Sequence, residues 1–173
     1  MEWTRVKPLK KYRLLPDDWS PKEIGTLVYV ADGDRILLIE KLRGHGAGLI
    51  NAPGGRLEHG ETIRECAVRE IWEEVGMTVW NLNLRGILRF HDIENGFDML
   101  GYAFVAGLFT GIPRKTDEAN PFWCHRAEIP YEQMWDDDKL WLPYLLSGKV
   151  INAELIFCDN LLKEHDVRAN SAL

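Results

Sequence analysis

The sequence is poor in cysteine and has no long apolar run. Its 173 residues include only Cys66, Cys124 and Cys158, which form no C-x-x-C pair. An odd number without paired spacing excludes a disulfide scaffold and is typical of a reducing compartment. No segment approaches the ~18 apolar residues of a membrane span, and residues 1–16 lack the apolar stretch of a signal peptide. These absences predict a cytoplasmic protein with no membrane partner.

An excess of positive charge is also absent. Lys and Arg number 21 against 27 Asp and Glu, which gives a net charge of −6 and a pI near 5.4. Such a surface repels nucleic acid. The basic residues near the start are few and interrupted, as in a solvated arm: Lys7, Lys10, Lys11 and Arg13. We therefore expect no nucleic-acid partner.

The organisation of the chain indicates one domain. We predict an irregular extension over residues 1–22, which contains three prolines, a single domain over 23–165 and a C-terminal tail over 166–173. Strand-like runs occupy residues 26–31, 35–40, 86–91, 98–109, 122–127 and 155–158, and helical patterns cover 62–75 and 138–146. Many strands with few helices predict an α+β fold, not a doubly wound sheet.

The predicted helix over residues 62–75 has clear ends. Thr62 and Glu65 have the spacing of a capping box, and Gly76 stands where a C-terminal cap belongs. Apolar residues recur every four positions and should face the core: Ile63, Ala67, Ile71 and Val75. Trp72 is expected in the core or against the sheet as well.

Three carboxylates share one face of this helix. Glu70, Glu73 and Glu74 stand at i, i+3 and i+4, a spacing at which like charges repel. A divalent cation would relieve the repulsion, and carboxylate oxygens favour Mg²⁺ or Mn²⁺ over zinc. The alternative for such a pattern alone is a solvated acidic face.

The helix belongs to a longer pattern that begins in a glycine-rich loop. It reads Gly55-x5-Glu61-x7-Arg69-Glu70-Ile71-x-Glu73-Glu74-x-Gly76-Met77. The glycines let the backbone turn sharply into the helix, whose free N–H groups favour anions, and Arg69 can pair with Glu61. The pattern resembles the signature of the Nudix hydrolases, which implies an α/β/α sandwich with a mixed central β-sheet.

This resemblance also implies a reaction, the metal-assisted hydrolysis of a diphosphate bond. The implied cofactor is Mg²⁺, with Mn²⁺ as an alternative. The implied catalytic residues are Glu70, Glu73, Arg69 and Glu118, and the implied metal ligands are Gly54 through its carbonyl, Glu70, Glu73, Glu74 and Glu118. Two points stay open: whether Glu70 or another acid is the general base, and whether Glu118 is only a surface loop acid.

Two further segments, 41–51 and 134–143, resemble one branch of the family, the oxidised-purine nucleoside triphosphatases (8-oxo-dGTP diphosphatases). The implied substrate-binding residues are Thr26, Lys41, Asn51, Pro53, Gly54, Gly55, Arg56, Trp135, Asp137 and Asp138. Asn51 can form two hydrogen bonds to a base edge, and Trp135 can stack on a base. If Asp137 and Asp138 are both buried, one should hold a proton and donate. The alternative is a solvated Asp-rich turn that caps the next helix.

These residues predict a Mg²⁺-dependent enzyme that converts oxidised or otherwise altered purine (d)NTPs, such as 8-oxo-dGTP, to (d)NMP and pyrophosphate. Its partner would be a small-molecule nucleotide, and the chain would be a monomer or a homodimer. The alternatives are a Nudix pyrophosphatase for other nucleotides (general NTPs or ADP-ribose) and a non-catalytic nucleotide-binding module. His45 replaces a phenylalanine found in the animal enzymes, Asp136 a proline and Leu42 a basic residue. These departures leave the base preference open.

Overall fold

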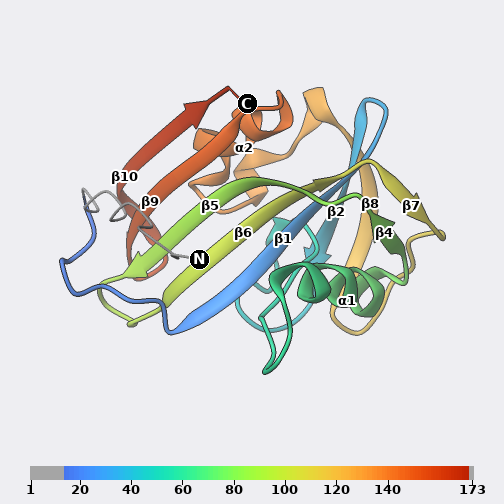
Figure 1. Ribbon diagram of the computed structural model, residues 1–173. Helices are drawn as coiled ribbons and strands as arrows, with labels where there is room; N and C mark the ends of the chain where they lie inside the picture. Colours follow the sequence, from blue (N-terminus) through green and yellow to red (C-terminus); the bar gives the residue numbers. More distant parts are fainter. Residues whose placement is uncertain (1–13, 172–173) are drawn as a thin grey trace, which may run out of the picture.

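A mixed β-sheet forms the centre of the computed structural model, which describes residues 14–171 (Figure 1). Within that range the sheet has eight strands in the order β10-β9-β5-β6-β1-β2-β3, with β8 paired to β2, and β4 and β7 form a separate two-stranded sheet. The strands are β1 (Glu23–Asp32), β2 (Arg35–Lys41), β3 (Ile50–Asn51), β4 (Thr78–Trp80), β5 (Asn83–Asp92), β6 (Asp98–Ala106), β7 (Leu108–Thr110), β8 (Ala119–His125), β9 (Val150–Cys158) and β10 (Leu161–Asn170). The helices are α1 (Ile63–Val75) and α2 (Asp138–Leu146), with short 3₁₀ turns at Arg126–Glu128 and Tyr131–Gln133.

Alternating residues of β1 supply both faces of the sheet. Val28 and Val30 pack with Ile71 of α1, whereas Tyr29 packs with Trp141 of α2. The two helices therefore cover opposite faces, as Figure 1 shows. Strand pairs β1–β6 and β5–β9 are parallel and the others antiparallel. The predicted α+β sandwich with a mixed sheet is confirmed.

The paths of β1 and β2 separate after their hairpin, and this separation creates room for the glycine-rich loop. The two strands pair only through Ala31 with Ile36 and Asp32 with Arg35. Beyond that point the edge of β1 bonds to residues 53–57: Val28 N–H donates to the Pro53 carbonyl (2.8 Å), and Thr26 N–H to the Gly55 carbonyl (2.8 Å). Backbone bonds thus fix this loop between β1 and α1.

The ends of α1 follow the sequence prediction. The Thr62 hydroxyl accepts from Glu65 N–H (3.3 Å), and the Glu65 carboxylate accepts from Thr62 N–H (2.8 Å). Gly76 ends the helix with φ of 70°, a conformation that glycine adopts without a steric penalty. Trp72 was expected in the core but is exposed, with the Arg114 guanidinium 5.6 Å from its ring centroid.

The C-terminal region differs from its prediction. Residues 166–170 were assigned to a tail, yet they continue β10, where Val167 pairs with Ala153 and Ala169 with Ile151 of β9. The segment is rich in charge because β10 is an edge strand, and charged residues protect such an edge from further pairing. The expected strand over 98–109 divides at Gly107 into β6 and β7, and that over 122–127 ends at His125.

Residues 14–22 precede β1 without helix or strand, and the basic residues at 7–13 lie outside the described range. Neither α1 nor α2 is long and apolar enough to cross a membrane, and these are the helices of residues 14–171.

Candidate active site

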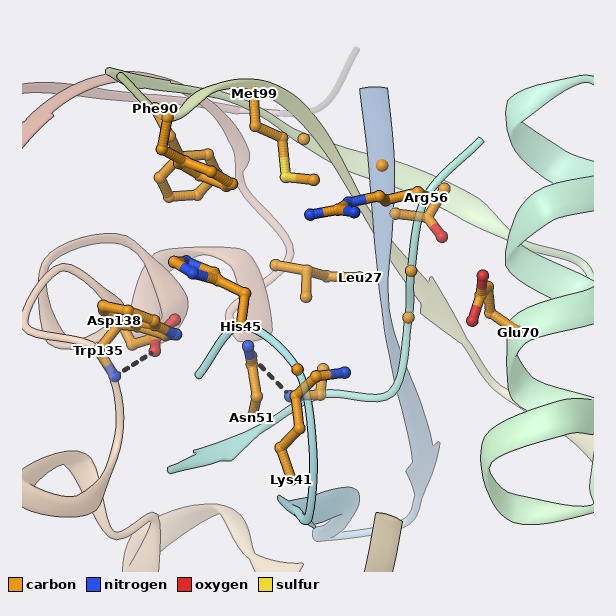
Figure 2. A pocket seen from close by; sticks show the side chains of 18 of the residues that line it. Leu27, Lys41, His45, Asn51, Arg56, Glu70, Phe90, Met99, Trp135 and Asp138 are labelled. Carbon is orange, nitrogen blue, oxygen red and sulfur yellow. Dashed lines mark hydrogen bonds between the residues drawn. The ribbon is translucent and has the colours of Figure 1, made fainter. Parts of the chain in front are cut away.

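A cavity of about 700 Å³ runs from α1 to the start of α2. Figure 2 shows Glu70 on one side of it and Trp135 and Asp138 on the other, with Leu27 and His45 between them. One end is therefore lined by carboxylates and cations, and the other by rings and two aspartates. The shape and chemistry suit an elongated ligand with one charged end and one flat, aromatic end.

Gly54 and Gly55 bring backbone into close contact with α1 and β1. Gly54 N–H donates to the Glu74 carboxylate (2.9 Å). A Cβ on Gly54 would lie 2.0 Å from the Thr26 carbonyl oxygen, and one on Gly55 would lie 2.3 Å from the carboxyl carbon of Glu70. Both distances are far below van der Waals contact. The backbone of β1 therefore requires glycine at position 54, whereas a side chain at position 55 would displace the Glu70 carboxylate.

Replacing Gly54 by alanine is expected to lower the free energy of unfolding by about 3 kcal/mol or more, since the new methyl group would collide with the backbone of β1. Urea denaturation measures the effect. Gly107 is the matched control, because no atom lies within 4 Å of a Cβ built there. Gly107→Ala should stay within ~0.5 kcal/mol of the wild type, and equal losses in the two variants would contradict the steric argument.

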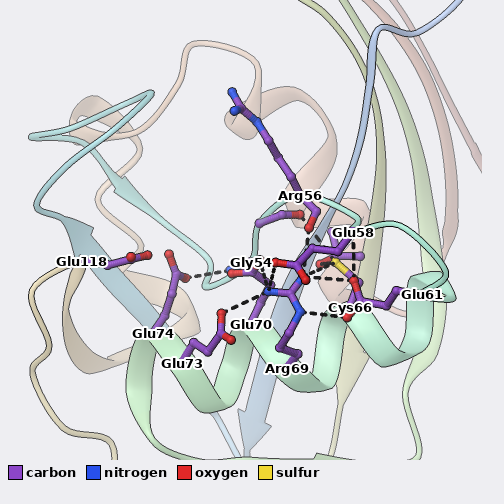
Figure 3. Close-up of polar contacts among 12 residues, drawn as sticks. Gly54, Arg56, Glu58, Glu61, Cys66, Arg69, Glu70, Glu73, Glu74 and Glu118 are labelled. Carbon is purple, nitrogen blue, oxygen red and sulfur yellow. Dashed lines mark hydrogen bonds and ion pairs between the residues drawn. The ribbon is translucent and has the colours of Figure 1, made fainter.

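Arg69 organises the carboxylates of α1 (Figure 3). Its guanidinium donates to Glu61 (2.8 and 3.0 Å), Glu70 (2.8 Å), Glu73 (3.0 Å) and the Arg56 carbonyl (3.0 Å). The pairing of Arg69 with Glu61 expected from the sequence is thus present. The surrounding carboxylates raise the pKa of Arg69. Arg69 therefore positions the loop and the acids, while its place in the catalytic set stays a prediction.

The three glutamates of α1 differ in environment. Glu74 is buried and accepts from Lys41 Nζ (3.2 Å) as well as from Gly54 N–H. Burial raises the pKa of Glu74 and of Glu70, and Lys41 and Arg69 respectively oppose that rise. The Glu73 side chain is 53% exposed and lies outside the cavity lining. The alternative of a simple solvated acidic face therefore does not describe Glu70 or Glu74.

Glu118 reaches the same end of the cavity from the segment before β8. The Thr116 hydroxyl donates to the Glu74 carbonyl (2.9 Å) and accepts from Glu118 N–H (3.3 Å), which fixes this segment against α1. Figure 3 shows the Glu118 side chain directed towards Glu74. Arg43 forms an ion pair with Glu118. Glu118 thus joins the site despite its distance in sequence.

Cations of the chain hold these carboxylates. Within residues 14–171, no three Asp, Glu, His or Cys side chains are arranged as a complete set of metal ligands. Instead Arg69 contacts Glu70 and Glu73, Lys41 contacts Glu74, and Arg43 contacts Glu118. The oxygen donors are nevertheless of the type that Mg²⁺ prefers.

At the other end, Asp137 and Asp138 are buried side by side, with 1% and 3% exposure. Trp141 Nε1 donates to Asp137 (2.8 Å), and Trp135 N–H donates to Asp138 (3.2 Å). Burial raises the pKa of Asp137 to about 6, and burial beside Asp137 raises that of Asp138 well above its usual value. Asp137 makes no side-chain cap on α2. The alternative of a solvated capping turn is therefore wrong, and the pair is poised to share one proton.

One oxygen of Asp137, Oδ1, is buried without a hydrogen-bond partner among residues 14–171. An unpaired buried acceptor is unfavourable, and Asp137 lines the cavity. A ligand that carries an N–H group would satisfy it.

Three stacked aromatic rings line the end of the cavity that holds Asp137 and Asp138. The His45 imidazole lies 4.5 Å from the ring centroid of Phe97 and 5.0 Å from that of Trp135, with interplanar angles of 18° and 19°. Burial lowers the pKa of His45, which favours the neutral ring. One face of Trp135 is thus covered by His45, so a base that stacks on this face must displace the imidazole. Stacking of a base on Trp135 stays a prediction.

The remaining predicted binding residues have mixed positions. Thr26 and Asn51 line the cavity, although the Thr26 hydroxyl lies 3.7 Å from Cys66 Sγ and the Asn51 amide oxygen accepts from Ala52 N–H (2.8 Å). Arg56 lines it too and pairs with Glu23 (2.7 Å). Pro53 is buried outside the lining, and its carbonyl bonds to β1.

Sequence reasoning missed the apolar wall of the cavity. The missed side chains share the α2 face of neighbouring strands: Leu27, Phe90, Met99 and Phe157. Phe90 pairs with Met99 across β5 and β6. Only strand order brings these residues together, and no local motif encodes it. Arg43, which also lines the cavity, lies by contrast within segment 41–51, whose resemblance to the oxidised-purine nucleoside triphosphatases was noted from the sequence.

The fold and the carboxylate site define a class of protein. The model of the NUDIX domain matches residues 21–145. This is more than half of the chain, so the chain belongs to the Nudix family and is a hydrolase that acts on phosphoric anhydride bonds. Nudix hydrolases act on small-molecule nucleotide substrates and generally need a divalent cation.

Particular relatives are similar over most of their length. The oxidized purine nucleoside triphosphate hydrolase of Danio rerio is 43% identical over 124 residues, which cover 72% of this chain and 80% of the relative. The protein of the same name from Mus musculus is 36% identical over 140 residues, covering 81% and 90%. The crystal structure of a MutT protein from Bacillus halodurans gives a TM-score of 0.75 at 29% identity, covering 84% of this chain and 97% of that one.

Proposed function

We propose that this protein hydrolyses oxidised purine nucleoside triphosphates, such as 8-oxo-dGTP, to the monophosphate and pyrophosphate. The observation that carries the proposal is the buried pair Asp137 and Asp138 at one end of a cavity whose other end holds Glu70, Glu74 and Glu118. The names of the relatives from Danio rerio and Mus musculus support the same substrate class.

The aspartate pair would read the base. With one shared proton, a neutral Asp138 donates to a carbonyl of the base, while an ionised Asp137 accepts from a ring N–H through its unpaired Oδ1. Oxidation of guanine at C8 adds a carbonyl and turns N7 from an acceptor into an N–H donor. A rigid pair of one donor and one acceptor can discriminate on such a change, because a mismatched base leaves a buried polar group unpaired.

The opposite end would hold the phosphates and the cation. Mg²⁺ would be held by the Gly54 carbonyl and by carboxylates of Glu70, Glu73, Glu74 and Glu118, and these oxygen donors fit its preference. When bound, the ion supplies positive charge that stabilises the charge developing on the phosphates. Lys41 and Arg56, which line the cavity, would bind phosphate oxygens.

The chain's own residues would direct the attacking water. Burial raises the pKa of Glu70. Glu70 would take a proton from the water molecule while the oxygen of that water attacks phosphorus. The α–β anhydride bond then breaks, and pyrophosphate leaves. Arg69 keeps the Glu70 carboxylate in place by a hydrogen bond of 2.8 Å. Substitution of Glu70 and, in separate variants, of the other acids of the site decides which carboxylate accepts the proton.

The test is steady-state kcat/KM with Mg²⁺ for 8-oxo-dGTP, 2-hydroxy-dATP, the ordinary dNTPs, ADP-ribose and a dinucleoside polyphosphate. Chromatography of the products shows which bond breaks. We expect at least about tenfold preference for an oxidised purine, the effect of one well-placed polar contact. A flat or ADP-ribose-led profile would discard the substrate assignment, and binding without hydrolysis would indicate a nucleotide-binding module.

A further inference from the structure

Each carboxylate at the phosphate end of the cavity is paired with a cation of the chain. Arg69 pairs with Glu70, Lys41 with Glu74 and Arg43 with Glu118, and Arg69 also pairs with Glu73 outside the cavity lining. In these pairs the side chains of Arg69 and Lys41 are each 22% exposed. Arg43 and Glu118 are different, with 63% and 40% exposure. The outer pair is therefore the one that solvent screens most and that a ligand can separate most easily.

The backbone around Arg43 is fixed, although its side chain is exposed. Leu42 N–H donates to the Glu118 carbonyl (2.8 Å), and Gly48 N–H donates to the Lys41 carbonyl (2.8 Å). These bonds hold the start of the loop against the Glu118 segment and close it on itself. Arg43 follows Lys41 by two positions, and both side chains line the cavity. The guanidinium can thus change its partner without a change in the fold.

We propose that Arg43 changes its ion-pair partner during turnover. In the free protein it neutralises Glu118; when a triphosphate binds, its guanidinium moves to the terminal phosphates and releases the Glu118 carboxylate to the divalent cation. The inference rests on the proposed function. A guanidinium binds phosphate oxygens with two parallel hydrogen bonds and binds carboxylates in the same way, so either partner satisfies it.

This exchange of partners would allow a cavity that holds Glu70, Glu74 and Glu118 to admit a polyanion. Without resident cations these acids would repel the triphosphate at the close distances of the site. Transfer of Arg43 supplies a positive charge to the phosphates and frees one carboxylate in the same step. Cation and nucleotide binding would then favour each other, as expected for two ligands coupled through one switching side chain.

Arg43→Ala tests both halves of the exchange. We expect KM for the triphosphate to rise about tenfold, as for a lost charge-assisted bond. The inhibition constant of the monophosphate product, which lacks terminal phosphates, should stay within about twofold, the scatter expected for a contact that is not made. Mn²⁺ binding without nucleotide, measured by electron paramagnetic resonance, should tighten about threefold because Glu118 loses its competitor.

Two further variants make the test specific. Arg35→Ala is the matched control, since Arg35 forms an exposed pair with Asp32 outside the cavity lining, and it should change none of the three constants. In a Glu118→Gln background, Arg43→Ala should no longer alter Mn²⁺ affinity. Unchanged or weaker Mn²⁺ binding in Arg43→Ala overturns the release of Glu118, and equal losses for triphosphate and monophosphate overturn the transfer to terminal phosphates. The Mn²⁺ measurement needs no substrate, so it stands apart from a failure of the proposed function.

Discussion

Replacing Glu70 with glutamine is expected to lower kcat by about 10²- to 10⁴-fold, the range for removal of a general base. Glutamine has the same shape and keeps an oxygen that can accept the hydrogen bond from Arg69. It also removes a carboxylate whose ionisation is opposed by burial. The fold should therefore be retained while proton transfer or cation binding is lost. Steady-state kinetics and a thermal unfolding curve on the same sample measure both effects.

The control for this substitution is Glu40→Gln, because Glu40 is exposed on β2 and lies outside the cavity lining. It should leave kcat within about twofold, as expected for a surface residue away from the site. Near wild-type turnover in folded Glu70→Gln would remove Glu70 from the catalytic set. Glu73→Gln is expected to lose activity as well. If it does not, Glu73 serves only to hold Arg69.

The second large effect is expected at Asp138. Asp138→Ala should raise KM for an oxidised purine triphosphate about ten- to a hundredfold, since the base would lose a buried hydrogen bond. Asp138→Asn should behave much like the wild type near neutral pH, because an amide donates as the neutral acid does. The measurement is KM for 8-oxo-dGTP in the three proteins across a range of pH.

The pH dependence separates these two variants further. A raised pKa means that Asp138 keeps its proton to higher pH than an ordinary aspartate. The wild-type KM should therefore increase as pH rises through the raised pKa of Asp138, because the neutral acid that donates the hydrogen bond is then lost. The amide of Asp138→Asn does not titrate in this range, so its KM should not increase with pH. Equal pH profiles in the two proteins, or unchanged kinetics in Asp138→Ala, would end the pocket assignment.

Local spacing was enough to predict α1 and its acids. The capping box at Thr62, the cap at Gly76 and the pairing of Arg69 with Glu61 all depend on residues a few positions apart, and the structure has them. The aspartate pair was predicted conditionally, on burial. Burial depends on how α2 packs on the sheet, which a short motif does not specify, and the structure supplies that condition.

Features that depend on distant parts of the chain were not predicted. Ile71 faces the core as the four-residue period predicts, but Trp72, expected in the core or against the sheet, points to solvent. The charged residues of β10 led to the prediction of a tail, because an edge strand needs few apolar residues and so lacks the usual apolar pattern of a strand. The stack of His45 on Trp135 joins two loops about ninety positions apart, and only the folded chain brings them together.

The separate origin of the two ends of the cavity has an evolutionary consequence. Two of the acids at one end of the cavity, Glu70 and Glu74, come from α1, whereas Asp137 and Asp138, which we propose recognise the base, stand at the start of α2 on the other face of the sheet. Mutations near α2 can thus alter which base is accepted without changing the acids on α1.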